Sequence, residues 1–270
     1  MSALAAIDDW DAEHAAAAAV RAEAILALQG ERKHIFRWAS VTKLFTACAV
    51  LVAAEEGILD LDEPGGPQGS TVRHLLAHAS GLPFEGDVPI SPPGERRIYS
   101  NSGFDTLGEL LAERADMPFA DYLAGAVLEP LGLDGVELRE RPSDGLHGTL
   151  EDLARFGSEL LAPTLVAPET LAEATEVAFP GLAGILPGIG RFEPNDWGLG
   201  FELKDAKEPH WTGSRNSPAT FGHFGGAGTF LWVDPDARVA CGVLTDRQFG
   251  DWALEVWPPL SDAVLAEFGG

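Results

Sequence analysis

The sequence has few cysteines, few basic residues and no long uninterrupted hydrophobic run. Its two cysteines, Cys48 and Cys241, lie in apolar stretches, which favours small buried side chains over a disulfide framework or a metal site. No window approaches the roughly 18–20 consecutive apolar residues of a membrane-spanning helix. The acidic, interrupted segment at residues 1–14 lacks the pattern of a secretory signal. We therefore expect a cytoplasmic protein that does not cross a membrane.

Basic residues are scarce relative to acidic ones. Lys and Arg together number 18 and Asp and Glu number 42, which gives a formal net charge of −24. A surface of that sign repels nucleic acid and anionic membranes, so neither is expected as a partner. The 270 residues, 46% of them hydrophobic, can bury a substantial core and so permit a compact enzyme. Nothing in the sequence indicates the oligomeric state.

Periodicity and capping residues predict several helices in the middle of the chain and strands near its end. The expected helices cover residues 40–56, 70–77, 101–115, 119–129, 149–161 and 260–268. Residues 222–233 and 238–245 have the composition of strands, joined by a hairpin turn at 234–237. The Pro- and Gly-rich stretch 163–194 is expected to be irregular and, with the residues up to Trp211, to form one wall of a cleft.

Residues 12–29 admit two interpretations. The alanine-rich run favours a helix because alanine is the best helix former. The same run divides into two short apolar stretches around Arg21-Ala22-Glu23 and is followed by Gly30, which suits a hairpin of buried strands. The hairpin would place an antiparallel sheet, built from both chain ends, beside an inserted helical region. A functional site is then expected in the cleft between the two.

Ser40-Val41-Thr42-Lys43 places a hydroxyl and an amine three residues apart, on one face of a helix. A neutral lysine there could take the serine proton, and the helix N-terminus would favour the oxyanion that forms when a carbonyl is attacked. The alternative is a serine that caps the helix and a lysine on the surface.

Two further segments contain residues that could act together with Ser40 and Lys43. Tyr99-Ser100-Asn101 lies between a loop and the next helix, where a phenol could relay protons if a nearby cationic lysine favoured the phenolate. Gly222-His223-Phe224-Gly225-Gly226 begins a predicted strand, where glycines permit close backbone approach to a ligand. His223 could hydrogen-bond Tyr99 and make activity depend on pH near its own titration.

The three motifs, in this order, resemble those of the serine beta-lactamase-like superfamily, which also contains penicillin-binding D-Ala-D-Ala peptidases, D-amino-acid peptidases and carboxylesterases. Its S-x-x-K motif matches Ser40 to Lys43, its Y-x-N motif matches Tyr99 to Asn101, and its K-T-G or H-x-G strand motif matches His223 to Gly225. Other segments resemble the class C and esterase branch, namely residues 71–82, 93–94, 129–133 and 231–235.

The resemblance implies an α+β fold of the beta-lactamase/transpeptidase type, with an antiparallel sheet formed from both chain ends, flanking helices and an inserted, mainly helical region. We expect a single catalytic domain over residues 1–270. Its sheet region would comprise about residues 1–38 and 195–270, and its helical region about residues 60–194.

The resemblance also implies roles for individual residues. Ser40 would be the nucleophile, and Lys43 and Tyr99 would be its proton-transfer partners. The backbone N–H groups of Ser40 and Gly226 would form the oxyanion hole, and Asn101 would contact a substrate amide or orient Lys43. The substrate-binding and oxyanion residues are thus Asn101, His223, Gly225 and Gly226, and neither a metal nor a cofactor is implied.

The match has departures. Phe224 replaces the threonine that often helps to bind the carboxylate of penicillins and acyl-D-Ala peptides, although Arg215 or Arg247 could supply such a contact. The class A deacylating glutamate has no recognisable counterpart. His74 and His78 are four residues apart but lack the glutamate of the zinc-protease pattern, so we expect structural roles for them.

These observations favour a serine hydrolase that acts through an acyl-enzyme on a small ester or amide, most simply an esterase. The alternatives are a catalytically silent member of the fold that binds a ligand or partner, a beta-lactamase or D-Ala-D-Ala peptidase, and a transesterase that uses the same residues. The sequence does not identify the acyl donor or acceptor.

Overall fold

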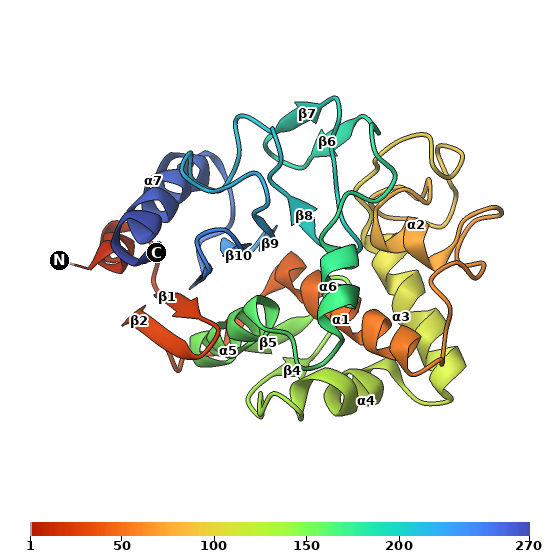
Figure 1. Cartoon of the computed structure of the whole chain (residues 1–270), viewed down its shortest axis with the longest axis horizontal. Helices are drawn as coiled ribbons and strands as arrows, with labels where there is room; N and C mark the ends of the chain where they lie inside the picture. The colour runs from red at the N-terminus through yellow and green to blue at the C-terminus, as the bar shows by residue number, and fades with distance from the viewer. Residues whose placement is uncertain (1) are drawn as a thin grey trace.

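The computed structural model describes residues 2–270 (Figure 1). The helices are η1 Ala3–Asp9, η2 Ala39–Val41, α1 Thr42–Glu55, α2 Val72–Leu76, α3 Asn101–Ala115, α4 Phe119–Leu123, η3 Ala124–Leu128, α5 Leu150–Leu161, α6 Pro168–Ala174 and α7 Asp251–Phe268. The strands are β1 Ala15–Arg21, β2 Ala24–Gly30, β3 Phe36–Arg37, β4 Glu137–Leu138, β5 Leu146–Gly148, β6 Gly184–Leu186, β7 Gly190–Phe192, β8 Glu202–Leu203, β9 Phe221–Gly225, β10 Thr229–Asp234 and β11 Val239–Thr245.

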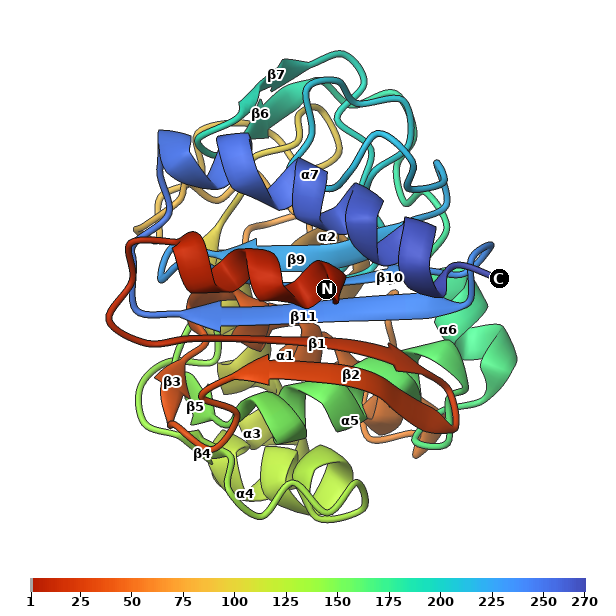
Figure 2. The ribbon, with the colours of Figure 1, turned by 90° about the vertical axis from the view of Figure 1, so that its left-hand side faces the viewer.

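Both ends of the chain contribute to one antiparallel sheet, as the sequence predicted. Its strand order is β2-β1-β11-β10-β9-β8, and β1 pairs with β11 from Ala15↔Thr245 to Val20↔Ala240. Figure 2 shows the two terminal strands, β1 and β2, side by side with β11. Of the elements between β3 and β7, helices α1 to α4 and α6 lie to the right of β1 and β2 in Figure 1, whereas α5 lies against the sheet.

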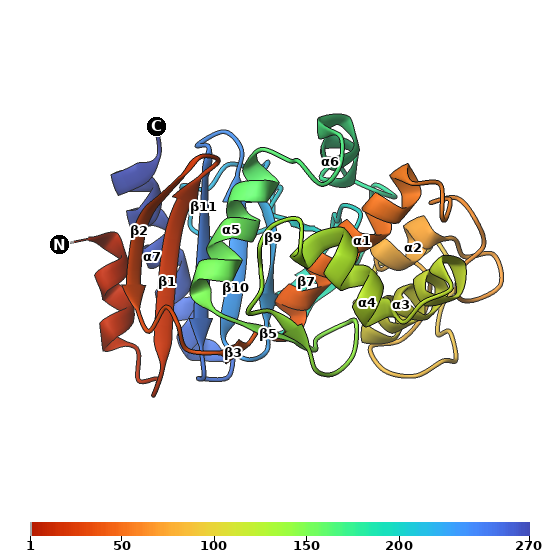
Figure 3. The same ribbon diagram turned by 90° about the horizontal axis from the view of Figure 1, so that it is seen from below.

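The sheet is covered on both faces (Figures 2 and 3). Helices η1 and α7 lie on one side, and α5 and α1 lie on the other. Alternate residues of β1 divide between two hydrophobic clusters: Ala16, Ala18 and Val20 join the cluster that contains α1 and α5, whereas Ala17 and Ala19 join the one that contains α7. Burial on both faces explains the uninterrupted apolar sequence of this strand.

The structure decides in favour of the hairpin at residues 12–29. Strands β1 and β2 pair antiparallel, and the turn between them contains Ala22 and Glu23. Helical propensity of alanine is a weak preference, worth at most about 0.7 kcal/mol per residue against ordinary residues. Ala16–Ala19 are fully buried, so two-sided packing and strand pairing outweigh that preference. Small residues also allow helix α5 to approach strand β1 closely. Gly157 of α5 is one of them, because a Cβ added there would already touch Val20 of β1.

Three other expectations differ from the structure. The final helix α7 starts at Asp251 rather than Leu260 and includes Pro258 and Pro259; burial of Trp257 offsets the backbone hydrogen bonds that the prolines remove. The stretch 163–194, expected to be irregular, contains α6 and the β6-β7 hairpin. The strand-like run 222–233 is divided by a turn into β9 and β10.

The cysteines and the membrane prediction agree with the structure. Cys48 and Cys241 are both buried free thiols, as their apolar surroundings predicted. No described helix combines the length and the apolar character needed to span a bilayer.

Candidate active site

Ser40 lies in the short helix η2, immediately before α1. Its neighbours Ala39 and Val41 are buried, whereas Ser40 itself is only partly buried. The residue at the N-cap of α1 is Val41, and no side chain caps the helix, so the alternative of a purely capping serine is wrong. Ala39 has φ +48°, a left-handed backbone that non-glycine residues rarely adopt and that is found preferentially at functional sites.

Lys43 is fully buried one turn after Ser40. Its Nζ lies 2.6 Å from Asn101 Oδ1, 2.9 Å from the Ser143 carbonyl oxygen and 3.3 Å from Ser40 Oγ. Burial lowers the pKa of Lys43 to about 7 from its ordinary value of 10.5, and the charge of Asp144 opposes that shift. The alternative of a surface lysine is therefore also wrong.

The contacts of Lys43 suit both the ammonium and the neutral amine. A neutral amine has two N–H donors and one lone pair, whereas an ammonium has three donors and no acceptor. Asn101 Oδ1 and the Ser143 carbonyl can only accept, so they take the two donors. In the ammonium the third N–H donates to Ser40 Oγ, whereas in the neutral amine the lone pair takes that position and can accept the hydroxyl proton of Ser40, as proton abstraction requires.

Tyr99 immediately precedes Ser100, the N-cap of α3, and its ring lies beside Lys43, with Nζ 4.9 Å from the ring centroid. Burial raises the pKa of the Tyr99 phenol, although a contact with the Ser40 hydroxyl opposes this. The expectation that the nearby lysine would favour the phenolate is therefore wrong, because desolvation of the buried phenol is the largest effect on its pKa. Tyr99 is better suited to donate a proton than to serve as the resting base.

His223 lies on β9 and is buried next to Tyr99. Its Nδ1 is 2.6 Å from the Phe224 carbonyl oxygen, which can only accept, so Nδ1 carries the proton and Nε2 does not. The bare Nε2 faces the Tyr99 hydroxyl at 3.4 Å. Burial, followed by the charge of Lys43, lowers the pKa of His223 to about 3. The expectation of a pH dependence near the ordinary titration of histidine is therefore wrong.

Gly225 brings the end of β9 against the segment that carries Ser40. A Cβ at Gly225 would lie 2.5 Å from the Trp38 carbonyl oxygen and 3.1 Å from the Ala39 Cβ, so only glycine fits. Within residues 2–270, neither the Ser40 N–H nor the Gly226 N–H donates a hydrogen bond to another group of the chain. A free N–H on the candidate nucleophile and another at the end of β9 are the kind of donors that an oxyanion hole requires.

Asn101 is held by a network that sequence reasoning missed. Its Oδ1 accepts from Lys43, and its Nδ2 donates to Glu85 Oε1 at 3.0 Å. Arg141 in turn contacts both oxygens of Glu85, at 2.8 and 3.1 Å. Of the two expected roles of Asn101, the geometry favours orienting Lys43. Glu85 and Arg141 are 56 residues apart, and no local pattern in the sequence marks either one.

The remaining candidates lie outside this group. The Phe224 ring packs 4.8 Å from Phe249 in the cluster beneath α7. Arg215 is exposed and its backbone N–H binds Asp262, a residue of α7. The Arg247 guanidinium stacks 4.5 Å above Trp252. Neither arginine contacts a residue of the proposed site.

His74 and His78 have structural surroundings, as expected. His74 forms a capping box with Thr71 at the start of α2. His78 accepts a hydrogen bond from the Ser100 N–H, and burial lowers its pKa well below the ordinary value. Trp197, from the stretch expected to form a wall of the cleft, packs with its ring centroid 5.8 Å from that of His223 and 4.9 Å from that of His78.

Comparisons with known proteins agree with the motifs. A family model described as Beta-lactamase matches residues 12–265. The chain is 28% identical over 180 residues to Penicillin-binding protein 4* of Bacillus subtilis (strain 168), a match that covers 54% of this chain and 39% of that protein. It is 24% identical over 329 residues to Esterase EstB of Burkholderia gladioli, covering 86% of this chain and 82% of the esterase. The chain thus spans less than half the length of the first of these relatives.

A solved structure matches the whole chain. A crystal structure described as a beta-lactamase from Mycobacterium bovis superposes with a TM-score of 0.98 and is 50% identical, covering 100% of both chains. This similarity confirms the predicted arrangement of a sheet from both chain ends with flanking helices.

Proposed function

This chain belongs to the beta-lactamase family, and we propose that it is a serine hydrolase that forms an acyl-enzyme on Ser40 with a small ester or amide substrate. The observation that carries this proposal is the environment of Lys43. Lys43 is fully buried, its pKa is lowered to about 7, and its Nζ lies 3.3 Å from Ser40 Oγ. A lysine that served only as a charged surface residue would have none of these properties.

Acylation would begin when Ser40 Oγ attacks the substrate carbonyl carbon and Lys43 Nζ takes the hydroxyl proton. The carbonyl oxygen becomes an oxyanion that accepts from the N–H groups of Ser40 and Gly226. The bond to the leaving group then breaks, and the departing atom takes a proton from the Tyr99 hydroxyl. Lys43 returns its proton to Tyr99, so the enzyme ends acylated with both groups in their starting protonation states.

Deacylation would use the same residues with water as the acceptor. A water molecule loses a proton to the Lys43–Tyr99 pair as its oxygen attacks the acyl carbon. The bond to Ser40 Oγ breaks, and the serine regains the proton. An alcohol or amine in place of water would give transesterification or aminolysis without any other change, so product analysis distinguishes these outcomes.

The surroundings of the site favour an ester over an acylamino substrate. Asn101 Nδ2, the donor that could bind a substrate amide, has one of its two N–H groups engaged by Glu85. Phe224 offers no hydroxyl for a substrate carboxylate and packs in the core. An ester with an apolar acyl group requires neither contact. The similarity of this chain to Esterase EstB agrees with a preference for esters.

Beta-lactam hydrolysis is the second candidate. It is favoured by the full-length similarity to the Mycobacterium bovis protein described as a beta-lactamase. A beta-lactam carbonyl would meet the same nucleophile and oxyanion donors. It would have to be bound without a threonine hydroxyl at position 224 and with one N–H of Asn101 engaged by Glu85.

Intact mass after reaction with a fluorophosphonate probe tests the proposal, alongside turnover of p-nitrophenyl esters and penicillin. We expect one adduct on the wild type and on Ser214→Ala, an exposed serine whose hydroxyl contacts Asp262 of α7, and none on Ser40→Ala. Ester turnover should disappear together with the adduct. A folded wild type that gives neither an adduct nor turnover would instead support a silent binding protein.

A further inference from the structure

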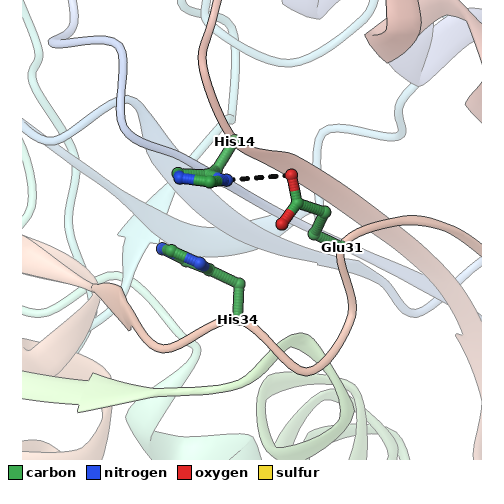
Figure 4. Close-up of side chains that lie close together, drawn as sticks. All are labelled: His14, Glu31 and His34. Carbon is green, nitrogen blue, oxygen red and sulfur yellow. Dashed lines mark hydrogen bonds and ion pairs between the residues drawn. The ribbon is translucent and has the colours of Figure 1, made fainter.

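A second group of chemically active side chains lies at the edge of the molecule, apart from the Ser40 site. His14 precedes β1, Glu31 follows β2, and His34 lies on the loop before β3 (Figure 4). One potential ligand atom from each of these residues lies within 4.8 Å of the others. His14 Nδ1 is 2.8 Å from Glu31 Oε1, and the two imidazole rings stack with centroids 4.0 Å apart.

The backbone holds the three residues together. The Glu31 N–H donates to the Ala15 carbonyl, and the His34 N–H donates to the Glu31 carbonyl, both at 3.0 Å. The β1-β2 pairing thus places Glu31 opposite Ala15, next to His14, and the turn at 31–34 brings the second imidazole onto the first. All three side chains reach solvent, with His14 and His34 partly buried and Glu31 exposed.

The chemistry of this group suits a divalent first-row transition metal. Two imidazoles and one carboxylate form a ligand set that Zn²⁺ accepts while keeping a further position open. Zinc-ligand bonds of about 2.0–2.1 Å in tetrahedral geometry separate ligand atoms by about 3.3 Å, so side-chain rotations suffice to converge on one ion. Without a metal, the group offers only an exposed His–Glu pair of the kind that contributes little to stability.

One residue of this group and one of the proposed oxyanion residues line the same cavity. Its volume is about 280 Å³, and its lining includes His34, Asp246 and Gly226. Asp246 also contacts His14, since its Oδ1 accepts from the His14 N–H at 3.2 Å. The cavity lined by His34 is thus also lined by the turn after β9.

We propose that His14, Glu31 and His34 form a binding site for one divalent transition-metal ion, with Zn²⁺ as the expected occupant. The ion would link the start of β1, the end of β2 and the loop before β3. It would therefore hold the outer hairpin of the sheet to the segment that leads into Ser40. This site is independent of the proposed acyl transfer, whose residues it does not share.

Calorimetric titration of the untagged, chelator-treated chain with ZnCl₂ tests the proposal. We expect one saturable site, and a loss of more than about tenfold in affinity in His14→Gln and in His34→Gln, since removal of even an outer-shell partner costs at least about that much. His147→Gln is the matched control, a partly buried histidine on β5 whose Nδ1 lies 3.1 Å from the Gly145 carbonyl oxygen. It should bind Zn²⁺ as the wild type does.

Cobalt substitution provides a second readout, because bound Co²⁺ in a four-coordinate site absorbs visible light strongly and either histidine variant should lose that band. Circular dichroism of the metal-free variants establishes that each is folded. Absence of saturable binding in the wild type, unchanged affinity in both histidine variants, or an equal loss in His147→Gln would each overturn the proposal. Loss in Asp246→Asn with retention in His34→Gln would overturn the ligand set.

Discussion

Lys43 should set the pH dependence of Ser40 acylation. Burial lowers the pKa of Lys43 from 10.5 to about 7, so about half of the molecules carry the neutral amine at pH 7. At pH 6 the neutral fraction is about one tenth, and at pH 8 about nine tenths. A lysine with an ordinary pKa would be neutral in only about one molecule in 3,000 at pH 7. Acylation should therefore accelerate about tenfold between pH 6 and pH 8 and level off above that range.

The assay is the second-order rate of inactivation by the fluorophosphonate probe from pH 5.5 to 9 at constant ionic strength. Constant ionic strength matters because it fixes the screening of the many surface carboxylates. Ser40→Ala gives the background reaction at each pH. Lys43→Arg keeps a positive charge but cannot supply a neutral base, so it should lose at least about 100-fold in rate and the pH dependence with it.

Two results would refute this reasoning. A rate that does not change between pH 6 and pH 8 would mean that Lys43 does not titrate in that range or is not the base. A midpoint near 6.5 that disappears in His223→Asn would assign the titration to the imidazole. The geometry argues against the second result, because burial lowers the pKa of His223 to about 3 and keeps the ring neutral over this whole range.

Two further predictions concern the surroundings of the nucleophile. The negative charge of Glu85 raises the pKa of Lys43, so Glu85→Gln should move the midpoint of the same inactivation profile to lower pH; an unchanged or higher midpoint would count against the network. Gly225→Ala should lower both thermal stability, by about 1–3 kcal/mol, and ester turnover, because its Cβ would lie 2.5 Å from the Trp38 carbonyl oxygen. Gly226→Ala, where nothing lies within 4 Å of the new Cβ, should retain its thermal stability, and an equal loss of stability in the two variants would contradict the close-approach argument.

Local signals in the sequence were sufficient for several elements. The helix predicted over residues 101–115 is α3 with the same bounds, because Ser100 caps it and apolar residues recur at helical spacing. Thr149 likewise caps α5 and forms a capping box with Asp152. These features act within one or two helical turns, so they can be identified without knowledge of the rest of the chain.

Elements whose structure depends on residues far away in the sequence could not be predicted from local signals. The alanine run of β1 becomes a strand because β2 and β11 pair with both of its edges and helices bury both of its faces. Helix α7 continues through two prolines because Trp257 is fully buried against the sheet. In both cases tertiary burial accompanies an element that local preference disfavours.

The sequence by itself determined the family, the order of the three motifs and the candidate residues Ser40, Lys43 and Tyr99. Only the tertiary structure decided their chemical states. Proton affinities depend on burial and on charges that the fold brings close, so the lowered pKa of Lys43, the raised pKa of Tyr99 and the neutral His223 follow from packing. The Glu85 contact that occupies Asn101 depends on the fold in the same way, because it joins a loop to a helix through side chains alone.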